Sequence, residues 1–307
     1  MKVIYLKKVE GIFAPIATIF DEAGDLDLES FCDNVRKFNE TKLSGLVVLG
    51  SNGEFPLLSY REKMALVKSA KETLDRDKLL IAGTGCESLR ETIMLSNESA
   101  DIGVDAILVV TPSYYKSDMT DEALERYFTT IADGCKVPVM LYNMPRNTGI
   151  NMGPSLVARL AKHPNIIGIK DSSGNISQIA EIIAKCPNDF AVFAGSGSFL
   201  LPTLMLGGVG GTLAVANVLP DYCAAIHDLY KEGDLDKARK LQLGLLELNA
   251  AVTTRYGIGG MKAAMEIVGF HGGSPRLPIL PASGAVKEEI SKIIVDALKV
   301  FSEVCGS

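Results

Sequence analysis

Short runs of apolar residues recur along the chain, separated by longer segments whose apolar positions have helical spacing. The runs are rich in Val, Ile and Leu and do not alternate with polar residues, which is typical of strands buried on both faces. Eight runs are predicted as strands: Phe13–Ile19, Leu46–Leu49, Leu79–Ala82, Ala106–Val110, Val137–Tyr142, Ile166–Ile169, Ala191–Phe193 and Thr212–Val215.

The segments between the runs carry helix signals. Ser59 and Glu62 have the spacing of a capping box at a helix start. Phe31, Val35 and Phe38 form an apolar stripe along one predicted helix. Strands that alternate with helices predict a parallel sheet, because parallel neighbours need a crossover connection.

Eight strand–helix units predict an α/β fold, a closed (β/α)8 or TIM barrel, over residues 1–216. An open, doubly wound sheet is the alternative, although no G-x-G-x-x-G motif follows the first run. Only helices are predicted beyond the barrel, beginning near Asp234, Gly260 and Val286. We expect residues 217–307 to pack on the barrel as a C-terminal helical extension.

Composition and charge exclude several classes of function. Of the 307 residues 47% are hydrophobic and 22% charged, which suits a globular domain with a sizeable core. The net charge of -6 offers no electrostatic footprint for nucleic acid. The uncharged segment Phe190–Pro220 is long enough to span a bilayer, but its glycines and prolines divide it into strand, helix and strand. We therefore expect a cytoplasmic protein that binds neither nucleic acid nor membranes.

Cysteine and histidine residues give no sign of a metal site. The six cysteines occur singly, without a C-x-x-C pair, and the three histidines lie far apart in the sequence. Scattered cysteines in a chain of this length are typical of reduced thiols inside the cell. The sequence therefore predicts no metal site, with convergence of distant ligands in the fold as the alternative.

A lysine ends the sixth apolar run, at Lys170. A lysine amine is almost fully protonated at neutral pH, but apolar surroundings disfavour the ammonium form. The neutral amine can attack a carbonyl and form a Schiff base. For Lys170 taken alone, a solvated side chain or an ion pair with Asp171 is the alternative.

Other polar residues are expected near Lys170, because the active site of such a barrel lies at the carboxyl ends of its strands. Tyr142 ends the fifth run, so neighbouring strands would place it beside Lys170, where a phenol can shuttle protons during imine formation. A core tyrosine with a satisfied hydroxyl is the alternative. The turn Gly50–Glu54 presents N–H groups that can bind a carboxylate. Glycines in Gly195–Gly197 and Gly207–Gly211 let the backbone approach a ligand.

Three of these motifs resemble the dihydrodipicolinate synthase/N-acetylneuraminate lyase family, and their spacing is similar as well. The motifs are Gly50–Glu54, Tyr142–Pro145 and Gly168–Asp171, and the resemblance extends from Gly11 to about Pro281. It implies a Schiff-base class I aldolase on a TIM barrel, which handles pyruvate and is usually a homotetramer.

The resemblance also implies roles for individual residues. Lys170 would form the imine and Tyr142 would shuttle protons. Ser51 and Asn52 would bind the pyruvate carboxylate, and Ser51 would link Tyr142 to Tyr114, which in relatives comes from the neighbouring subunit. The other expected substrate contacts are Arg146, Asn147, Gly195, Ser196 and Thr212.

One position within the resemblance separates two branches. Members that make the lysine precursor typically carry arginine five residues after the strand-five tyrosine, where it grips the carboxylate of aspartate semialdehyde. Here that residue is Asn147, and the arginine stands one position earlier, at Arg146. Four segments are more similar to 4-hydroxy-2-oxoglutarate and 2-keto-3-deoxy sugar-acid aldolases: Gly50–Pro56, Ala82–Glu87, Asn147–Gly149 and Asn249–Thr253.

We therefore predict a lyase that breaks or forms a carbon–carbon bond between pyruvate and an aldehyde. Such a Schiff-base aldolase would need no metal and no external cofactor. 4-Hydroxy-tetrahydrodipicolinate synthase is the nearest alternative. A non-catalytic ligand-binding barrel is a second, against which the intact Lys170, Tyr142 and Ser51 argue. A pyridoxal-phosphate enzyme is a third, which a visible absorbance spectrum would reveal. Val252–Gly257 is expected to help shape the aldehyde pocket.

Overall fold

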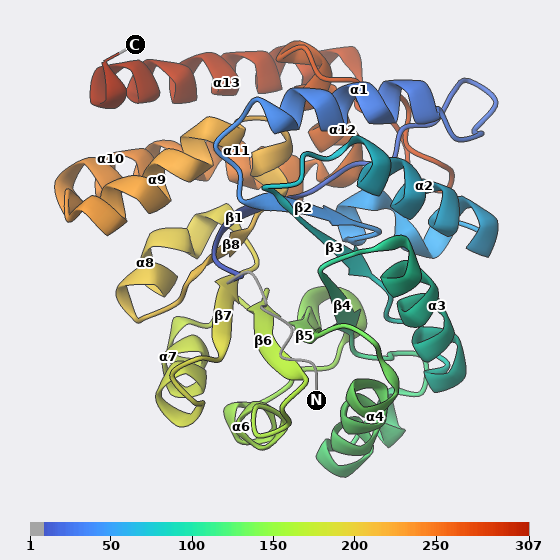
Figure 1. Ribbon diagram of the computed structural model, residues 1–307. Helices are drawn as coiled ribbons and strands as arrows, with labels where there is room; N and C mark the ends of the chain where they lie inside the picture. Colours follow the sequence, from blue (N-terminus) through green and yellow to red (C-terminus); the bar gives the residue numbers. More distant parts are fainter. Residues whose placement is uncertain (1–8, 307) are drawn as a thin grey trace.

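The computed structural model describes residues 9–306 and contains a closed barrel of eight parallel strands (Figure 1). Each strand pairs with the next along the chain, and the eighth pairs with the first. This closure confirms the (β/α)8 prediction and excludes the open sheet. The strands are β1 (Gly11–Pro15), β2 (Gly45–Val48), β3 (Leu79–Gly83), β4 (Ala106–Val110), β5 (Val139–Asn143), β6 (Ile166–Asp171), β7 (Ala191–Ala194) and β8 (Gly210–Thr212).

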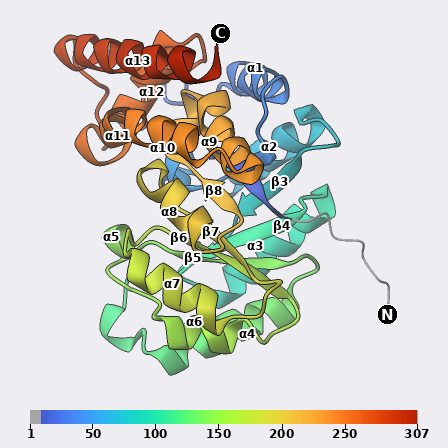
Figure 2. The same cartoon turned by 90° about the vertical axis from the view of Figure 1, so that its left-hand side faces the viewer.

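Helices surround the strands, and a further group of helices lies on one side of the barrel (Figures 1 and 2). Those between strands are α1 (Leu28–Asn39), α2 (Tyr60–Thr73), α3 (Leu89–Ile102), α4 (Asp121–Gly134), α5 (Pro145–Thr148), α6 (Pro154–Leu160), α7 (Ile176–Lys185) and α8 (Leu200–Met205). Those after β8 are α9 (Pro220–Glu232), α10 (Leu235–Gly244), α11 (Leu246–Ala250), α12 (Gly257–Ile267) and α13 (Gly284–Cys305). Helix α9 packs against α8 and β1, and α13 packs against α10, α11 and α12. The division of the chain at residue 216 stays a prediction.

The helix signals in the sequence correspond to contacts in the structure. Ser59 caps α2: its hydroxyl accepts from the Glu62 N–H at 3.4 Å, and its own N–H donates to Glu62 Oε2 at 2.7 Å. In α1 the residues Phe31, Val35 and Phe38 are buried against the barrel. Capping and the apolar stripe therefore identify both helices correctly.

The predicted position of the eighth strand, Thr212–Val215, is wrong. The strand is Gly210–Thr212, and Ala214–Asn217 forms a 3-10 turn instead. A Cβ atom on Gly210 would lie 1.9 Å from the carbonyl oxygen of Gly11 on β1, so only glycine fits where these two strands meet. A search for apolar runs misses a strand that begins with glycines.

The predicted first strand, Phe13–Ile19, is also displaced. Strand β1 is Gly11–Pro15, so pairing begins and ends earlier than the apolar pattern suggests. The residues from Ile16 to Ile19 leave the sheet but remain buried. The apolar run extends beyond the last paired residue of β1, because the residues that follow are buried at the barrel rim.

The uncharged segment from residue 190 to residue 220 does not form one long helix. It contains β7, the 3-10 turn η4 (Gly197–Phe199), α8, β8 and the 3-10 turn η5 (Ala214–Asn217). Within residues 9–306, no helix combines the length and the apolar composition that a bilayer crossing requires.

The interior of the barrel is filled with side chains that point inward from alternate positions on the strands. Phe13 of β1 and Phe193 of β7 meet edge to face there, with their ring centroids 5.7 Å apart. Met140 and Tyr142 of β5 belong to the same buried cluster. The barrel is therefore a packed core, and any substrate must bind at its rim.

Arg276, in the segment between α12 and α13, binds Glu62 of α2 through its guanidinium at 2.6 Å. This contact lowers the pKa of Glu62 from 4.5 to about 2. Because the folded-state pKa is depressed, the stabilisation is complete above pH 4.5 and is lost as the pH falls toward 2.

We therefore expect Glu62→Gln to lower the stability at pH 7, by on the order of 1 kcal/mol for a partly solvated pair. The difference between wild type and variant should shrink as the pH falls from 4.5 to 2. Urea unfolding of both proteins across this range measures it. A difference that stays constant with pH would contradict the assignment.

Candidate active site

Lys170 lies near the end of β6, points into the barrel and is 2% exposed. In the ladder it is the register partner of Tyr142 on β5 and of Phe193 on β7. Its Nζ atom lies over the Tyr142 ring, 4.2 Å from the centroid. The lysine and tyrosine that the sequence suggests as neighbours are therefore side by side, with the amine over the tyrosine ring.

Asp171, the next residue, projects from the opposite face of β6, because successive strand residues alternate in direction. Its Oδ2 atom accepts from Asn143 at 2.8 Å and from Gln178 at 3.0 Å, and Oδ1 accepts from the Ser173 N–H at 2.9 Å. This carboxylate is fully buried and is held by neutral donors. Asp171 therefore points away from Lys170, and the two residues do not form the ion pair that was the alternative.

Tyr142 connects the lysine to the turn after β2. Its hydroxyl oxygen lies 3.3 Å from Ser51 Oγ, and either group can be the donor. The ring is 4% exposed, so the hydroxyl has little access to water. Ser51, Tyr142 and Lys170 form one continuous row across the barrel mouth.

The turn that carries Ser51 and Asn52 is the 3-10 segment η1 (Ser51–Gly53), and its flanks have unusual backbone geometry. Leu49 and Glu54 have φ angles of 59° and 55°, in the left-handed region that non-glycine residues rarely adopt. Each such residue costs of order 1–3 kcal/mol and persists only where the surroundings hold it. The turn is thus held in a specific shape.

Residues after β7 and at the end of β8 complete this rim. Asn249 Nδ2 donates to Ser196 Oγ at 3.1 Å, which fixes that serine. A Cβ atom on Gly195 would lie 1.9 Å from Ser172 Oγ, so close packing against the loop after β6 already requires glycine there. Thr212 is buried at the end of β8. The sequence does not indicate this contact between Asn249 and Ser196, although Asn249–Thr253 is one of the segments that resemble the aldolase branch.

Tyr114 does not join this row within the chain. It follows β4, is 79% exposed, and its ring packs edge to face on that of Tyr115 at 5.1 Å. Its contribution to a neighbouring subunit's site stays a prediction, as does the tetramer.

A cavity of about 580 Å³ opens beside the row. Ser51, Met144 and Asn147 line it, and no arginine stands among the described residues of its wall. A narrower hollow next to it reaches Tyr142. Asn147 therefore borders the space that a substrate would occupy, whereas its neighbour Arg146, which is likewise exposed, is not part of this wall.

The segment Val252–Gly257 contributes less than expected. Ala251–Arg255 is a π-helical turn, η6, between α11 and α12. Arg255 lies at the surface, where its guanidinium forms ion pairs with Glu247 at 2.8 Å and Glu289 at 3.1 Å. Only the following residue, Ile258, reaches the cavity wall.

The cavity wall also carries a cysteine thiol and ionisable side chains, among them Lys63 and Glu87. Cys86 lines the wall, but burial and the nearby Glu91 carboxylate raise its pKa to about 11, so it is a neutral thiol at pH 7. In the part of the chain that the structure describes, no three His, Cys, Asp or Glu side chains gather as a metal site would require.

Comparison with known proteins agrees with this architecture. A model of the dihydrodipicolinate synthetase family matches residues 8–297. The chain belongs to the dihydrodipicolinate synthetase family. Two similar relatives are named 4-hydroxy-tetrahydrodipicolinate synthase. The protein of Geobacter metallireducens is 35% identical over 285 residues, 93% of this chain and 97% of its own. The protein of Leptospira biflexa is 36% identical over 292 residues, 94% and 98% of the two chains.

Solved structures of the dihydrodipicolinate synthetase family superpose closely on this chain. The 4-hydroxy-tetrahydrodipicolinate synthase of Methylacidiphilum fumariolicum has a TM-score of 0.91 at 30% identity, covering 97% of this chain and 98% of its own. A prophage protein of the dihydrodipicolinic acid synthase family from E. coli, solved in complex with pyruvate, has a TM-score of 0.89 at 31% identity, with coverage of 95% and 99%. The chain is an enzyme of this family, a pyruvate-dependent class I aldolase.

Proposed function

We propose that this enzyme cleaves a 4-hydroxy-2-oxo acid into pyruvate and an aldehyde, and can join the two in reverse. 4-Hydroxy-2-oxoglutarate or a 2-keto-3-deoxy sugar acid is the substrate class. The observation that carries the choice is Asn147 on the cavity wall, at the position where lysine-pathway synthases carry a carboxylate-gripping arginine. The Asn147 amide can donate hydrogen bonds to hydroxyl or carboxylate oxygens of such substrates and can accept one from a hydroxyl.

The reaction would begin at Lys170. Its neutral amine attacks the keto carbon of the substrate, and loss of water leaves an imine between Nζ and that carbon. Ser51 and Asn52 would hold the adjacent carboxylate, which orients the keto carbon toward the lysine.

Cleavage follows from the protonated imine. The bond between the third and fourth carbons breaks, its electron pair moves toward the imine nitrogen, and the 4-hydroxyl loses its proton as the aldehyde forms. Tyr142 would take up that proton as its own hydroxyl proton moves to the Ser51 hydroxyl, 3.3 Å away, and Ser51 passes its proton to water. The remaining enamine takes a proton at the third carbon by the reverse of this transfer, and water then releases pyruvate and restores Lys170. Gly195, Ser196 and Thr212 would line the same site.

The synthase reaction of pyruvate with aspartate semialdehyde is the second candidate. The names of the similar relatives favour it over aldol cleavage. Both reactions pass through the same enamine, and they differ in the protein group that contacts the aldehyde. Lys63 on the cavity wall, or Arg146 of α5, next to Asn147 in the sequence, would then provide the gripping cation.

We expect kcat/KM for 4-hydroxy-2-oxoglutarate or 2-keto-3-deoxygluconate to exceed that for pyruvate plus aspartate semialdehyde by about 100-fold or more, because a charge-assisted arginine contact is absent from the wall. A panel that also includes N-acetylneuraminate measures this. Arg146→Ala should leave the preferred cleavage within about 3-fold of wild type, whereas Asn147→Ala should weaken it by about 10-fold. Preference for aspartate semialdehyde, with its loss in Arg146→Ala, would establish the synthase instead.

The remaining expectations belong to the same proposal. A neighbouring copy would place its Tyr114 near Ser51, which is consistent with the exposure of this tyrosine. We expect a cytoplasmic homotetramer that needs no metal and no external cofactor. Sedimentation of Tyr114→Ala and wild type, together with their turnover, tests whether the tyrosine acts across an interface.

A further inference from the structure

Glu54, directly after the turn that carries Ser51 and Asn52, has a buried charge that the reaction does not use. Its side chain is fully enclosed, although a carboxylate is among the groups least often found in protein interiors. Its N–H donates to the Ser51 carbonyl at 3.2 Å, so its position is coupled directly to the turn. The left-handed backbone at Glu54, with φ of 55°, needs something to hold it.

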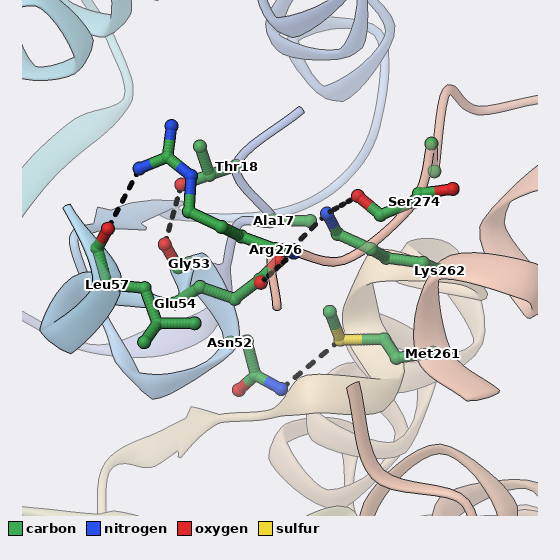
Figure 3. A network of polar contacts seen from close by, with 12 residues as sticks. Ala17, Thr18, Asn52, Gly53, Glu54, Leu57, Met261, Lys262, Ser274 and Arg276 are labelled. Atoms are coloured by element: carbon green, nitrogen blue, oxygen red, sulfur yellow. Dashed lines mark hydrogen bonds and ion pairs between the residues drawn. The ribbon is translucent and has the colours of Figure 1, made fainter. Parts of the chain in front are cut away.

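Lys262 of α12 supplies the opposite charge. Its Nζ atom lies 2.8 Å from Glu54 Oε1, and its side chain is 1% exposed. The ammonium also donates to the Ser274 carbonyl at 3.0 Å and lies 4.7 Å from the centroid of the Phe20 ring. Burial lowers the pKa of Lys262, while the Glu54 carboxylate opposes that fall. Figure 3 shows the two side chains meeting beside the turn.

Further contacts clamp the same few residues. The backbone N–H of Arg276 donates to Glu54 Oε2 at 2.8 Å. Thr18 Oγ1 donates to the Gly53 carbonyl at 2.6 Å, and Asn52 Nδ2 approaches Met261 Sδ at 3.2 Å (Figure 3). The turn is thus held from the loop after β1, from α12 and from the segment before α13.

Stability alone does not explain such a pair. A buried ion pair is often no more stabilising than two apolar side chains of the same size, because both charges lose their hydration. Here the ion pair also fixes the distance between α12 and the turn. If either charged group moved away, the other would be left buried without its partner.

We propose that Glu54 and Lys262 are positioning residues, whose ion pair fixes the Ser51–Asn52 turn against α12 in the geometry that binds the carboxylate of a 2-oxo acid. This rests on the proposed role of Ser51 and Asn52. It makes a helix that follows the barrel part of the active-site scaffold, although neither charge need touch the substrate. Displacement of such a turn by about 1 Å can cost 10²-fold in a positioned reaction.

The test compares four variants by pyruvate-dependent borohydride trapping and by thermal unfolding: Glu54→Gln, Lys262→Met, the double variant, and Lys78→Met. Lys78 is the matched control, a buried lysine that donates to the Thr41 and Leu43 carbonyls near the amino ends of the strands. Trapping at a series of pyruvate concentrations gives a half-saturating concentration and a maximal rate separately.

We expect half-saturating pyruvate to rise about 10- to 100-fold in both single variants and in the double variant, because the turn is released in all three. The maximal trapping rate should change less than 3-fold, since Lys170 is untouched. The double variant should melt at a higher temperature than either single variant, because no buried charge is left alone. Lys78→Met should lower the melting temperature without changing half-saturation.

Normal half-saturation in the double variant would overturn the proposal, whatever its melting temperature, because the pair would then be structural only. A double variant that does not fold would overturn it as well, since the pair would be holding the barrel and not the turn. If wild type itself were not trapped by pyruvate, the proposed function would fail instead, which keeps the two failures distinct.

Discussion

Lys170→Ala is expected to lower turnover by more than about 10⁴-fold, because the variant has no amine with which to form the imine. The strand should tolerate the change, since Lys170 forms no ion pair with Asp171 and alanine fits a buried strand position. Pyruvate release from the preferred substrate measures the loss, and circular dichroism checks the fold.

The matched control is Lys78→Met, which removes another buried lysine from near the opposite end of the barrel. We expect its turnover at a temperature below its melting point to stay within about 3-fold of wild type. Equal losses in the two variants would mean that Lys170 acts through stability, and the proposed chemistry would not hold.

Tyr142→Phe removes only a hydroxyl and is expected to lower kcat by about 10²–10⁴-fold, the usual contribution of a general acid–base group. The ring that covers Lys170 remains, so packing and the position of the lysine should be kept. Steady-state kinetics, with the melting temperature as a check on folding, measure the effect.

Ser51→Ala serves as the companion to Tyr142→Phe, because it removes the other half of the 3.3 Å contact. A smaller loss, of about 10-fold, is expected if the serine orients the phenol and helps bind the carboxylate. Near-normal turnover in Tyr142→Phe would make Tyr142 a packing residue, and another proton carrier would have to be found.

The sequence was sufficient for the barrel and for the neighbourhood of Lys170 and Tyr142. Parallel strands of eight similar units place their last residues on one rim, so two residues at the ends of consecutive runs must lie close together. The prediction failed at β8, where glycines and not apolar residues form the strand, because the crowding of Gly210 against Gly11 is a tertiary fact.

Contacts between distant segments were beyond the reach of sequence patterns. The pairing of Glu54 with Lys262 joins residues 208 positions apart, and nothing in the local spacing of either indicates the other. The same holds for Asn249 and Ser196. A lysine among apolar neighbours, such as Lys262 between Met261 and Ala263 in α12, is the one local sign of a distant partner, since an unpaired buried charge is too costly to keep.

The most direct test of the account is reductive trapping of the imine. Wild-type enzyme is incubated with pyruvate and borohydride, and the adduct is located by intact-mass and peptide-mass spectrometry. We expect one reduced pyruvyl unit per chain, on Lys170, and none in Lys170→Ala. An adduct on another lysine, or no adduct while the enzyme still turns over, would contradict the central claim that Lys170 forms the Schiff base.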